Sequence, residues 1–333
     1  MPPAAPAPDG RPPDAAIFVA GMPRSGTSLM RLILGSHPEV AMLEVELPLW
    51  REIARAHAGS DLGQPGPRQR LIQDLVGHPN MRRAAVAPDG VLLADELAGQ
   101  PAVTLGTVFA HAFRQVARRA GKARWGVKDP RSEFLADRIF AELPACRLVH
   151  LVRDPRDVLA SQRAASGRLA QHVVSTVEAW RRSARQARRG PLTHAGAYVA
   201  VRYEDLVRDP ARVVRDICPA LGLTYRPAMV EVAGRLLRPP REAGGSGRLA
   251  EPISPRPVGR FRADLHPGDV RYVQWRAGRE MRDWGYEAEP VGATSGRVRL
   301  MRRLGEEGAW RGLSAAGIWP IVSRALGRLP PGT

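Results

Sequence analysis

Short apolar runs alternate with longer amphipathic stretches over most of the chain. Four apolar-rich runs predict buried strands, because each is bounded by glycine, proline or charged positions: 17–20, 124–127, 148–152 and 198–202. After the first run, apolar residues at helical spacing continue to Gly35. Strands that alternate with helices in this way predict a parallel α/β sheet.

Helical spacing of apolar residues also predicts helices after the later strands. These helices are expected through Ser161 and over residues 172–189, 209–221 and 270–284. Residues 47–120 are mostly helical in pattern with Gly/Pro-rich interruptions, and they predict a helical insertion. In a doubly wound sheet, ligands bind at the carboxyl ends of the strands, so a functional site is expected there.

The ends of the chain do not follow these patterns. Residues 1–15 are rich in proline and alanine and lack the apolar stretch of a signal peptide, so we expect a disordered tail before a domain over 16–290. Residues 291–333 form a basic amphipathic tail, which can pack on the body, contact a membrane surface peripherally or bind a partner; packing is favoured. Residues 238–258 predict a mobile loop. No apolar run is long enough for a transmembrane segment, and the expected location is the cytoplasm.

The charge balance indicates an anionic partner. The formal net charge is +17, and all but two of the 50 basic residues are arginines. Such a charge favours nucleic acid, a membrane surface or a phosphorylated ligand. The arginines are spread through ordinary α/β segments and form no basic stripe, so nucleic-acid binding is not expected. Cys146 and Cys218 are far apart and predict buried thiols, and no metal-ligand spacing occurs, so no metal is expected.

A glycine-bearing loop joins the first predicted strand to the first helix. It reads GMPRSGTS and contains Arg24, Ser25, Gly26, Thr27 and Ser28. Glycine lets the backbone approach an anion closely, and the N-terminus of the following helix supplies N–H donors. A Walker loop would have lysine in place of Thr27, so the β/γ-phosphate clamp of an ATPase or kinase is missing. The loop therefore favours a different phosphate donor, with a kinase-like phosphotransferase as the alternative.

A second anion site is indicated after the strand 148–152. Arg153 ends this strand, and Ser161 follows eight residues later, about two turns into the next helix. A guanidinium can bind a phosphate through two parallel hydrogen bonds, and a serine hydroxyl can add a third.

Three motifs occur in the order PRSGTS, RDPRDVLAS and YEDL, and together they resemble the sulfotransferases. The similarity is greatest to bacterial, tyrosylprotein and heparan-type sulfotransferases, and it covers about residues 17–286. It implies the fold of the P-loop-containing nucleotide hydrolases, α/β with a central parallel sheet flanked by helices. It also implies that 3′-phosphoadenosine 5′-phosphosulfate (PAPS) is the co-substrate, with no metal, and that a sulfuryl group is transferred to a hydroxyl.

The resemblance also implies how the nucleotide is bound. Arg153 and Ser161 match the residues that hold the 3′-phosphate in the family, and Tyr203 of YEDL matches a tyrosine near the adenine. Arg260, in the segment PVGRFR, matches a basic residue that closes over the 3′-phosphate. The amides and hydroxyls of the PRSGTS loop match the 5′-phosphosulfate site.

For the chemical step, the resemblance assigns charge stabilisation to Arg24 and Lys128. Lys128 lies in a K-D-P segment like that of tyrosylprotein sulfotransferases, and the histidine base of phenol sulfotransferases is absent. The base is then expected to be a glutamate. Glu44 matches the heparan-type pattern and is favoured, and Glu46 is the alternative. On an extended strand the two would share one face.

The acceptor is expected to be a small molecule: a metabolite, a glycolipid or a natural product with a hydroxyl group. His37 precedes a proline at a helix end and His150 lies within a buried strand, so both are expected to be structural. A non-enzymatic binder of nucleic acid or membranes is the remaining alternative. No pattern in the chain indicates an oligomeric state.

Overall fold

The computed structural model describes residues 16–46, 49–79, 81, 87–100, 102–166, 173–232 and 252–291. The predicted tails and most of the predicted mobile loop lie outside these residues. The chain divides into two compact units. The first unit holds the described residues of Met1–Gly21, Ser25–Val152 and Gln186–Ser254, and the second holds those of Met22–Arg24, Arg153–Arg185 and Pro255–Thr333. The predicted domain limits of 16–290 remain a prediction.

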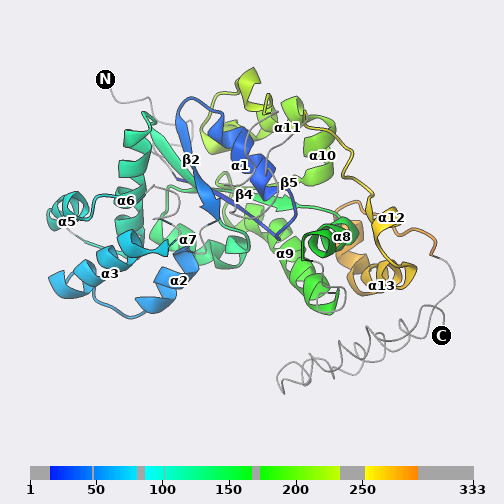
Figure 1. The fold of residues 1–333 in the computed structure, drawn as a ribbon, viewed down its shortest axis with the longest axis horizontal. Helices are drawn as coiled ribbons and strands as arrows, with labels where there is room; N and C mark the ends of the chain where they lie inside the picture. The colour runs from blue at the N-terminus through cyan, green and yellow to red at the C-terminus, as the bar shows by residue number, and fades with distance from the viewer. Residues whose placement is uncertain are drawn as a thin grey trace, which may run out of the picture. The chain divides into compact units, whose positions relative to one another are not determined.

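A five-stranded parallel sheet forms the centre of the first unit (Figure 1). The strand order is β2-β3-β1-β4-β5, and every neighbouring pair is parallel. The strands are β1 (Ile17–Gly21), β2 (Val40–Glu46), β3 (Arg124–Lys128), β4 (Arg147–Val152) and β5 (Tyr198–Arg202). The four strands predicted from apolar runs are confirmed. Strand β2 was not predicted from such a run, because charged residues occupy its second half.

The first unit also contains most of the helices. They are α1 (Thr27–Gly35), α2 (Leu49–Ala56), α3 (Pro65–Gly77), α5 (Gly90–Ala98), α6 (Leu105–Arg119), α7 (Ala136–Glu142), α10 (Tyr203–Arg208), α11 (Pro210–Ile217) and the end of α9 (Val173–Thr193). Short 3₁₀ turns follow at Ser132–Leu135, Pro219–Leu221 and Pro227–Met229. Helices α2, α3, α5 and α6 occupy the stretch that the sequence predicts to be mostly helical.

In the core of the first unit, successive side chains of a strand point to opposite faces of the sheet. Phe18 of β1 and Trp125 of β3 belong to one buried cluster with Phe109 and Phe113 of α6. The ring centroid of Trp125 lies 5.0 Å from that of Phe113 and 6.0 Å from that of Phe18. Val19, which alternates with Phe18 on the strand, is also fully buried. The sheet is therefore covered on both faces, as its continuous apolar strands require.

The second unit is helical. It contains α8 (Pro155–Ser166), the first part of α9, α12 (Phe261–Asp264) and α13 (Pro267–Asp283), and α8 packs against α12 and α13. Trp180 of α9 donates its indole N–H to the Arg153 carbonyl at 2.7 Å. Arg181 forms two hydrogen bonds to Glu280 of α13, each of 3.1 Å. The predicted helices through Ser161 and over 172–189 and 270–284 are confirmed.

Both cysteines are buried, as predicted, and burial raises the pKa of the Cys218 thiol to about 11. Within the ranges that the structure describes, no helix combines the length and the apolar character needed to cross a membrane.

His150 is fully buried in β4, and its Nδ1 lies 2.6 Å from the Tyr198 hydroxyl on β5. Burial lowers the pKa of this imidazole to about 3, so the folded protein keeps it neutral at ordinary pH. The unfolded chain, with an ordinary histidine pKa, takes up a proton as the pH falls below about 6.5. The titration of His150 therefore leaves the unfolding free energy unchanged above that pH and lowers it progressively as the pH falls towards 3.

We expect His150→Gln to remove part of the acid sensitivity of the fold. Glutamine can still hydrogen-bond the Tyr198 hydroxyl but does not titrate. Between pH 7.0 and 5.5 the wild type should lose about 1 kcal/mol more unfolding free energy than the variant. Urea unfolding at the two pH values measures this difference. Equal losses in the two proteins would show that His150 contributes nothing to the pH dependence.

Candidate active site

The residues at the start of α1 form a backbone anion site in the first unit. Gly26 is the N-cap of α1 and has φ 94°, in the left-handed region. A Cβ atom at Gly26 would lie 2.4 Å from the Tyr203 ring, so both the conformation and the space require glycine. Ser25 and Thr27 are buried on either side. The N–H groups of the first helical turn have no acceptor within the helix itself, so they suit an anion at this position.

Lys128 lies at the carboxyl end of β3 and is brought to the predicted phosphate loop. Its side chain is buried, and Nζ donates to the Ser28 hydroxyl at 3.2 Å. The chain that follows fixes the end of β1. The Arg131 N–H donates to the Gly21 carbonyl at 3.1 Å, and the Gly21 N–H donates to Glu133 Oε2 at 3.0 Å. An ammonium group is thereby held beside the first turn of α1.

The two candidate bases lie on β2. Its backbone is extended through Glu44 and Glu46, and the β2–β3 register places Glu46 opposite Lys128. Their side chains lie outside the described part of the structure. The β2–β3 register shifts between Met42 and Glu46. That the two glutamates share a face, and the choice between them, therefore remain predictions.

Arg24, Arg153 and Ser161 come together in the second unit. The Arg153 guanidinium is buried, and its Nη1 donates to the Arg24 carbonyl at 3.0 Å. Its Nη2 donates to the Pro257 carbonyl at 2.7 Å. The Arg24 Nε donates to the Ser161 hydroxyl at 2.9 Å. Arg24 has φ 78°, a conformation that non-glycine residues adopt rarely and that is frequent at functional sites.

The remaining charged residues of the RDPRDVLAS motif form hydrogen bonds within the second unit. Arg156 binds both carboxylate oxygens of Asp154, at 2.7 Å from Nη2 and 3.0 Å from Nε, and its guanidinium lies 4.2 Å from the centre of the Phe261 ring. Asp157 accepts two backbone N–H bonds, and sequence reasoning missed it. The available signal was its position one helical turn after Arg153.

Two other predicted residues have different surroundings. Arg260 is 57% exposed and pairs with Asp264 at 2.9 Å. Tyr203 is buried with its ring against Gly26. A closing role for Arg260 and an adenine contact for Tyr203 remain predictions.

His37 has a structural set of contacts. Its Nδ1 accepts the Glu39 N–H at 3.2 Å, so Nε2 is the protonated nitrogen and donates to the Thr224 carbonyl at 3.0 Å. Burial lowers the pKa of this imidazole. Both nitrogens are therefore occupied, in agreement with the expected structural role. Among the described residues, no three His, Cys, Asp or Glu side chains form a group that could hold a metal ion.

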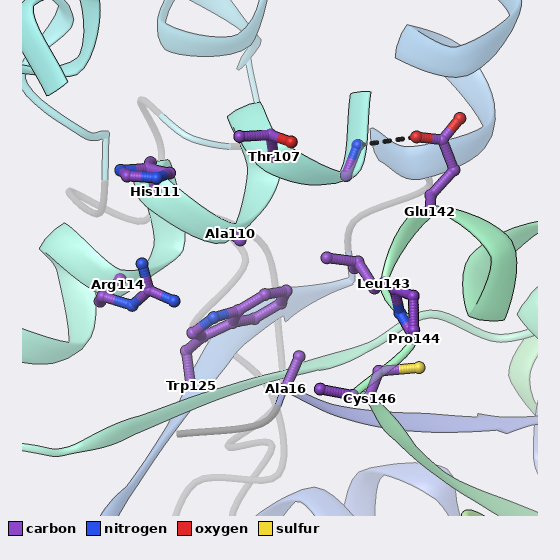
Figure 2. Close-up of a pocket in the computed structure, with 12 residues that line it drawn as sticks. Ala16, Thr107, Ala110, His111, Arg114, Trp125, Glu142, Leu143, Pro144 and Cys146 are labelled. Carbon is purple, nitrogen blue, oxygen red and sulfur yellow. Dashed lines mark hydrogen bonds between the residues drawn. The ribbon is translucent and has the colours of Figure 1, made fainter. Parts of the chain in front are cut away.

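A cavity of about 260 Å³ is drawn in Figure 2. It lies at the amino-terminal ends of the strands, whereas Lys128 lies at a carboxyl end. It is lined by Ala16, next to the first residue of β1, and by Trp125 near the start of β3. Its charged side chains have protein partners: His111 contacts Glu96 at 3.1 Å, and Glu142 accepts the Gly106 N–H at 3.0 Å. None of the predicted site residues lines this cavity.

The model of a sulfotransferase family matches residues 16–227. The sulfotransferase domain of the Synechococcus PCC 7002 olefin synthase is 22% identical with a TM-score of 0.50, and the match covers 85% of this chain and 98% of that domain. The sulfotransferase domain from the curacin biosynthetic pathway is 17% identical with a TM-score of 0.52, and the match covers 83% and 99%. No curated protein sequence matches the chain.

At these identities the two solved structures show the fold alone, and they confirm the predicted nucleotide-hydrolase-like α/β architecture. The family model reaches further, because it spans well over half of the chain and contains the phosphate loop, Lys128, Arg153 and Ser161. The protein therefore belongs to the sulfotransferase family of enzymes.

Proposed function

We propose that the protein transfers the sulfuryl group of PAPS to a hydroxyl of a small-molecule acceptor. The observation that carries the proposal is the cluster of Arg24, Arg153 and Ser161: the Arg24 guanidinium donates to the Ser161 hydroxyl, and the Arg153 guanidinium donates to the Arg24 carbonyl. Guanidinium groups bind phosphate dianions through parallel charge-assisted hydrogen bonds. A site for the 3′-phosphate, with Arg260 closing over it, would separate PAPS from ATP and AMP.

The 5′ side of the nucleotide is assigned to the phosphate loop. The N–H groups at the start of α1, with Ser25, Gly26, Thr27 and Ser28, would bind the 5′-phosphosulfate, and Tyr203 would lie towards the adenine. Lys128 is held by Ser28, close to these N–H groups. Preorganised donors of this kind stabilise charge that develops in a transition state.

In the proposed step the acceptor oxygen attacks sulfur, and the bond from sulfur to the bridging oxygen of the 5′-phosphate breaks. The hydroxyl proton passes to a glutamate carboxylate, and the electron pair of the broken bond stays on the phosphate. The products are a sulfate ester and adenosine 3′,5′-bisphosphate. Lys128 and Arg24 stabilise the charge on the leaving phosphate and the sulfuryl oxygens.

Replacing the base with glutamine should reduce turnover without weakening the binding of the nucleotide. We assign the base to Glu44, with Glu46 as the alternative supported by its backbone register opposite Lys128. Glu44→Gln should lower kcat by about 10² to 10⁴, because general base catalysis contributes that much. The KM for PAPS should change less than about twofold, because uniform binding of the donor is kept. Initial rates with Glu46→Gln and the exposed control Glu39→Gln separate the candidates. A larger loss in Glu46→Gln would transfer the role to Glu46.

The activity can be tested without knowing the acceptor. The protein is incubated with ³⁵S-labelled PAPS and a pooled cell extract, and labelled products are identified by the mass of one added SO₃. We expect label in a metabolite, a glycolipid or a natural product carrying a hydroxyl group. Calorimetry on the same protein should show that adenosine 3′,5′-bisphosphate binds more tightly than AMP. Equal affinities for the two nucleotides would by themselves refute the proposal.

A further inference from the structure

Asp157 connects helix α8 to a segment about a hundred residues away. Its side chain is 1% exposed. Oδ2 accepts the Gly259 N–H at 2.7 Å, and Oδ1 accepts the Phe261 N–H at 3.0 Å. Both oxygens of one buried carboxylate are thus used to fix two backbone amides, and hydrogen bonds to an ionised acceptor are stronger than neutral ones.

The residue between these two amides is Arg260. The Arg260 carbonyl accepts the N–H groups of Ala263 and Asp264, each at 3.0 Å, so α12 begins directly from the bound turn. Gly259 has φ 76°, in the left-handed region that residues with a side chain rarely adopt. The turn therefore requires glycine, and Asp157 sets the backbone on both sides of Arg260.

Arg153 contacts the same segment through a backbone carbonyl. Its Nη2 donates to the Pro257 carbonyl at 2.7 Å and lies 4.0 Å from Asp157 Oδ2. Because both side chains are buried, the carboxylate offsets the charge of the guanidinium and limits where it can move. One acidic residue thereby fixes two groups that the proposed function assigns to the 3′-phosphate: the Arg153 guanidinium and the backbone of Arg260.

We propose that Asp157 is a positioning residue for the 3′-phosphate and that it determines how strongly the enzyme prefers nucleotides carrying that group. This inference rests on the proposed function. Asp157 is an acceptor and carries negative charge, so it is not suited to bind a phosphate itself, and its two oxygens accept the Gly259 and Phe261 N–H groups. It acts through Arg153 and the turn at 257–261.

The test is Asp157→Asn, which keeps the shape of the side chain. The amide loses the negative charge and presents an NH₂ group to one of the two backbone N–H donors. We expect the dissociation constant for adenosine 3′,5′-bisphosphate to rise at least tenfold and that for AMP to change less than twofold, by calorimetry. The KM for PAPS should rise in parallel, while kcat at saturating PAPS changes less than threefold. A purely structural role would not produce this split.

Asp216→Asn is the matched control, because it makes the same charge change on an exposed face of α11, where Asp216 pairs with Arg212. It should leave both affinities within twofold of the wild type. Equal losses for the two nucleotides in a folded Asp157→Asn protein, or no loss at all, would overturn the inference. A wild type that binds the two nucleotides equally would instead overturn the proposed function.

A measurement on the wild type decides the matter if Asp157→Asn does not fold. Hydrogen–deuterium exchange should be followed over residues 255–265 in the presence of each nucleotide at saturation. Adenosine 3′,5′-bisphosphate should slow exchange in this segment at least fivefold more than AMP does. Equal protection by both nucleotides would show that the segment does not respond to the 3′-phosphate, and the inference would be wrong.

Discussion

Arg153→Met should weaken the binding of adenosine 3′,5′-bisphosphate by about two to three orders of magnitude, which corresponds to about 2.7–4 kcal/mol. The affinity for AMP should change less than about threefold, because AMP has no 3′-phosphate and so does not make the charge-assisted contact that the substitution removes. Methionine retains much of the buried volume but removes the guanidinium that holds the Arg24 and Pro257 carbonyls. Calorimetry with both nucleotides measures the difference.

A matched control separates the effect of the Arg153 guanidinium from that of the general positive charge of the protein. Arg185 lies in the same unit, is 55% exposed and pairs with Glu280. Arg185→Met removes the same charge, and it should leave both affinities within about twofold, because exposed ion pairs contribute little. Comparable losses of AMP and bisphosphate binding in Arg153→Met would refute its assignment to the 3′-phosphate.

Lys128→Met should lower kcat by about 10³, because removing one preorganised donor to developing charge costs about that much. The buried ammonium is held against Ser28, so a water molecule or another cation cannot easily take its place. Binding of adenosine 3′,5′-bisphosphate should weaken less than about tenfold, because most of the nucleotide contacts remain. Single-turnover rates and calorimetry test the two statements separately.

The control for this variant is the other lysine of the chain. Lys122 is half-buried and donates to the His37 carbonyl at 3.2 Å, away from the phosphate loop. Lys122→Met should keep kcat within about threefold, because it removes no donor to the transition state. A normal rate in Lys128→Met would show that Arg24 and the loop amides suffice for the chemistry.

The strands and helices that bury a continuous apolar pattern could be predicted from the sequence. Strand β5 was predicted with its exact bounds, Tyr198–Arg202, and β1 to within one residue. Strand β2 was not predicted, because its second half contains charged residues that are unfavourable for a buried strand. Its pairing with β3, which stabilises it, is a contact with a distant segment. The strand order was not predictable either, since it depends on contacts between distant segments.

The site shows the same division. The prediction that Arg153 and Ser161 serve one anion site was made from local spacing, because both lie in one strand–helix segment. The contact between Arg24 and Ser161 spans 137 residues, and only the family resemblance suggested that the two belong to one site. Asp157 was not predicted, because its position four residues after Arg153 does not reveal its partners, which are backbone amides about a hundred residues away. The exposed position of Arg260 is likewise a property of the folded turn.

The close approach of the Tyr203 ring to Gly26 has a consequence for exchanging parts between members of the family. The two residues are far apart in the sequence, yet any side chain at position 26 would overlap the aromatic ring. The phosphate loop and the YEDL segment therefore form one steric unit. A chimera that receives a foreign loop should fold and work best when it also receives the donor protein's counterpart of this tyrosine.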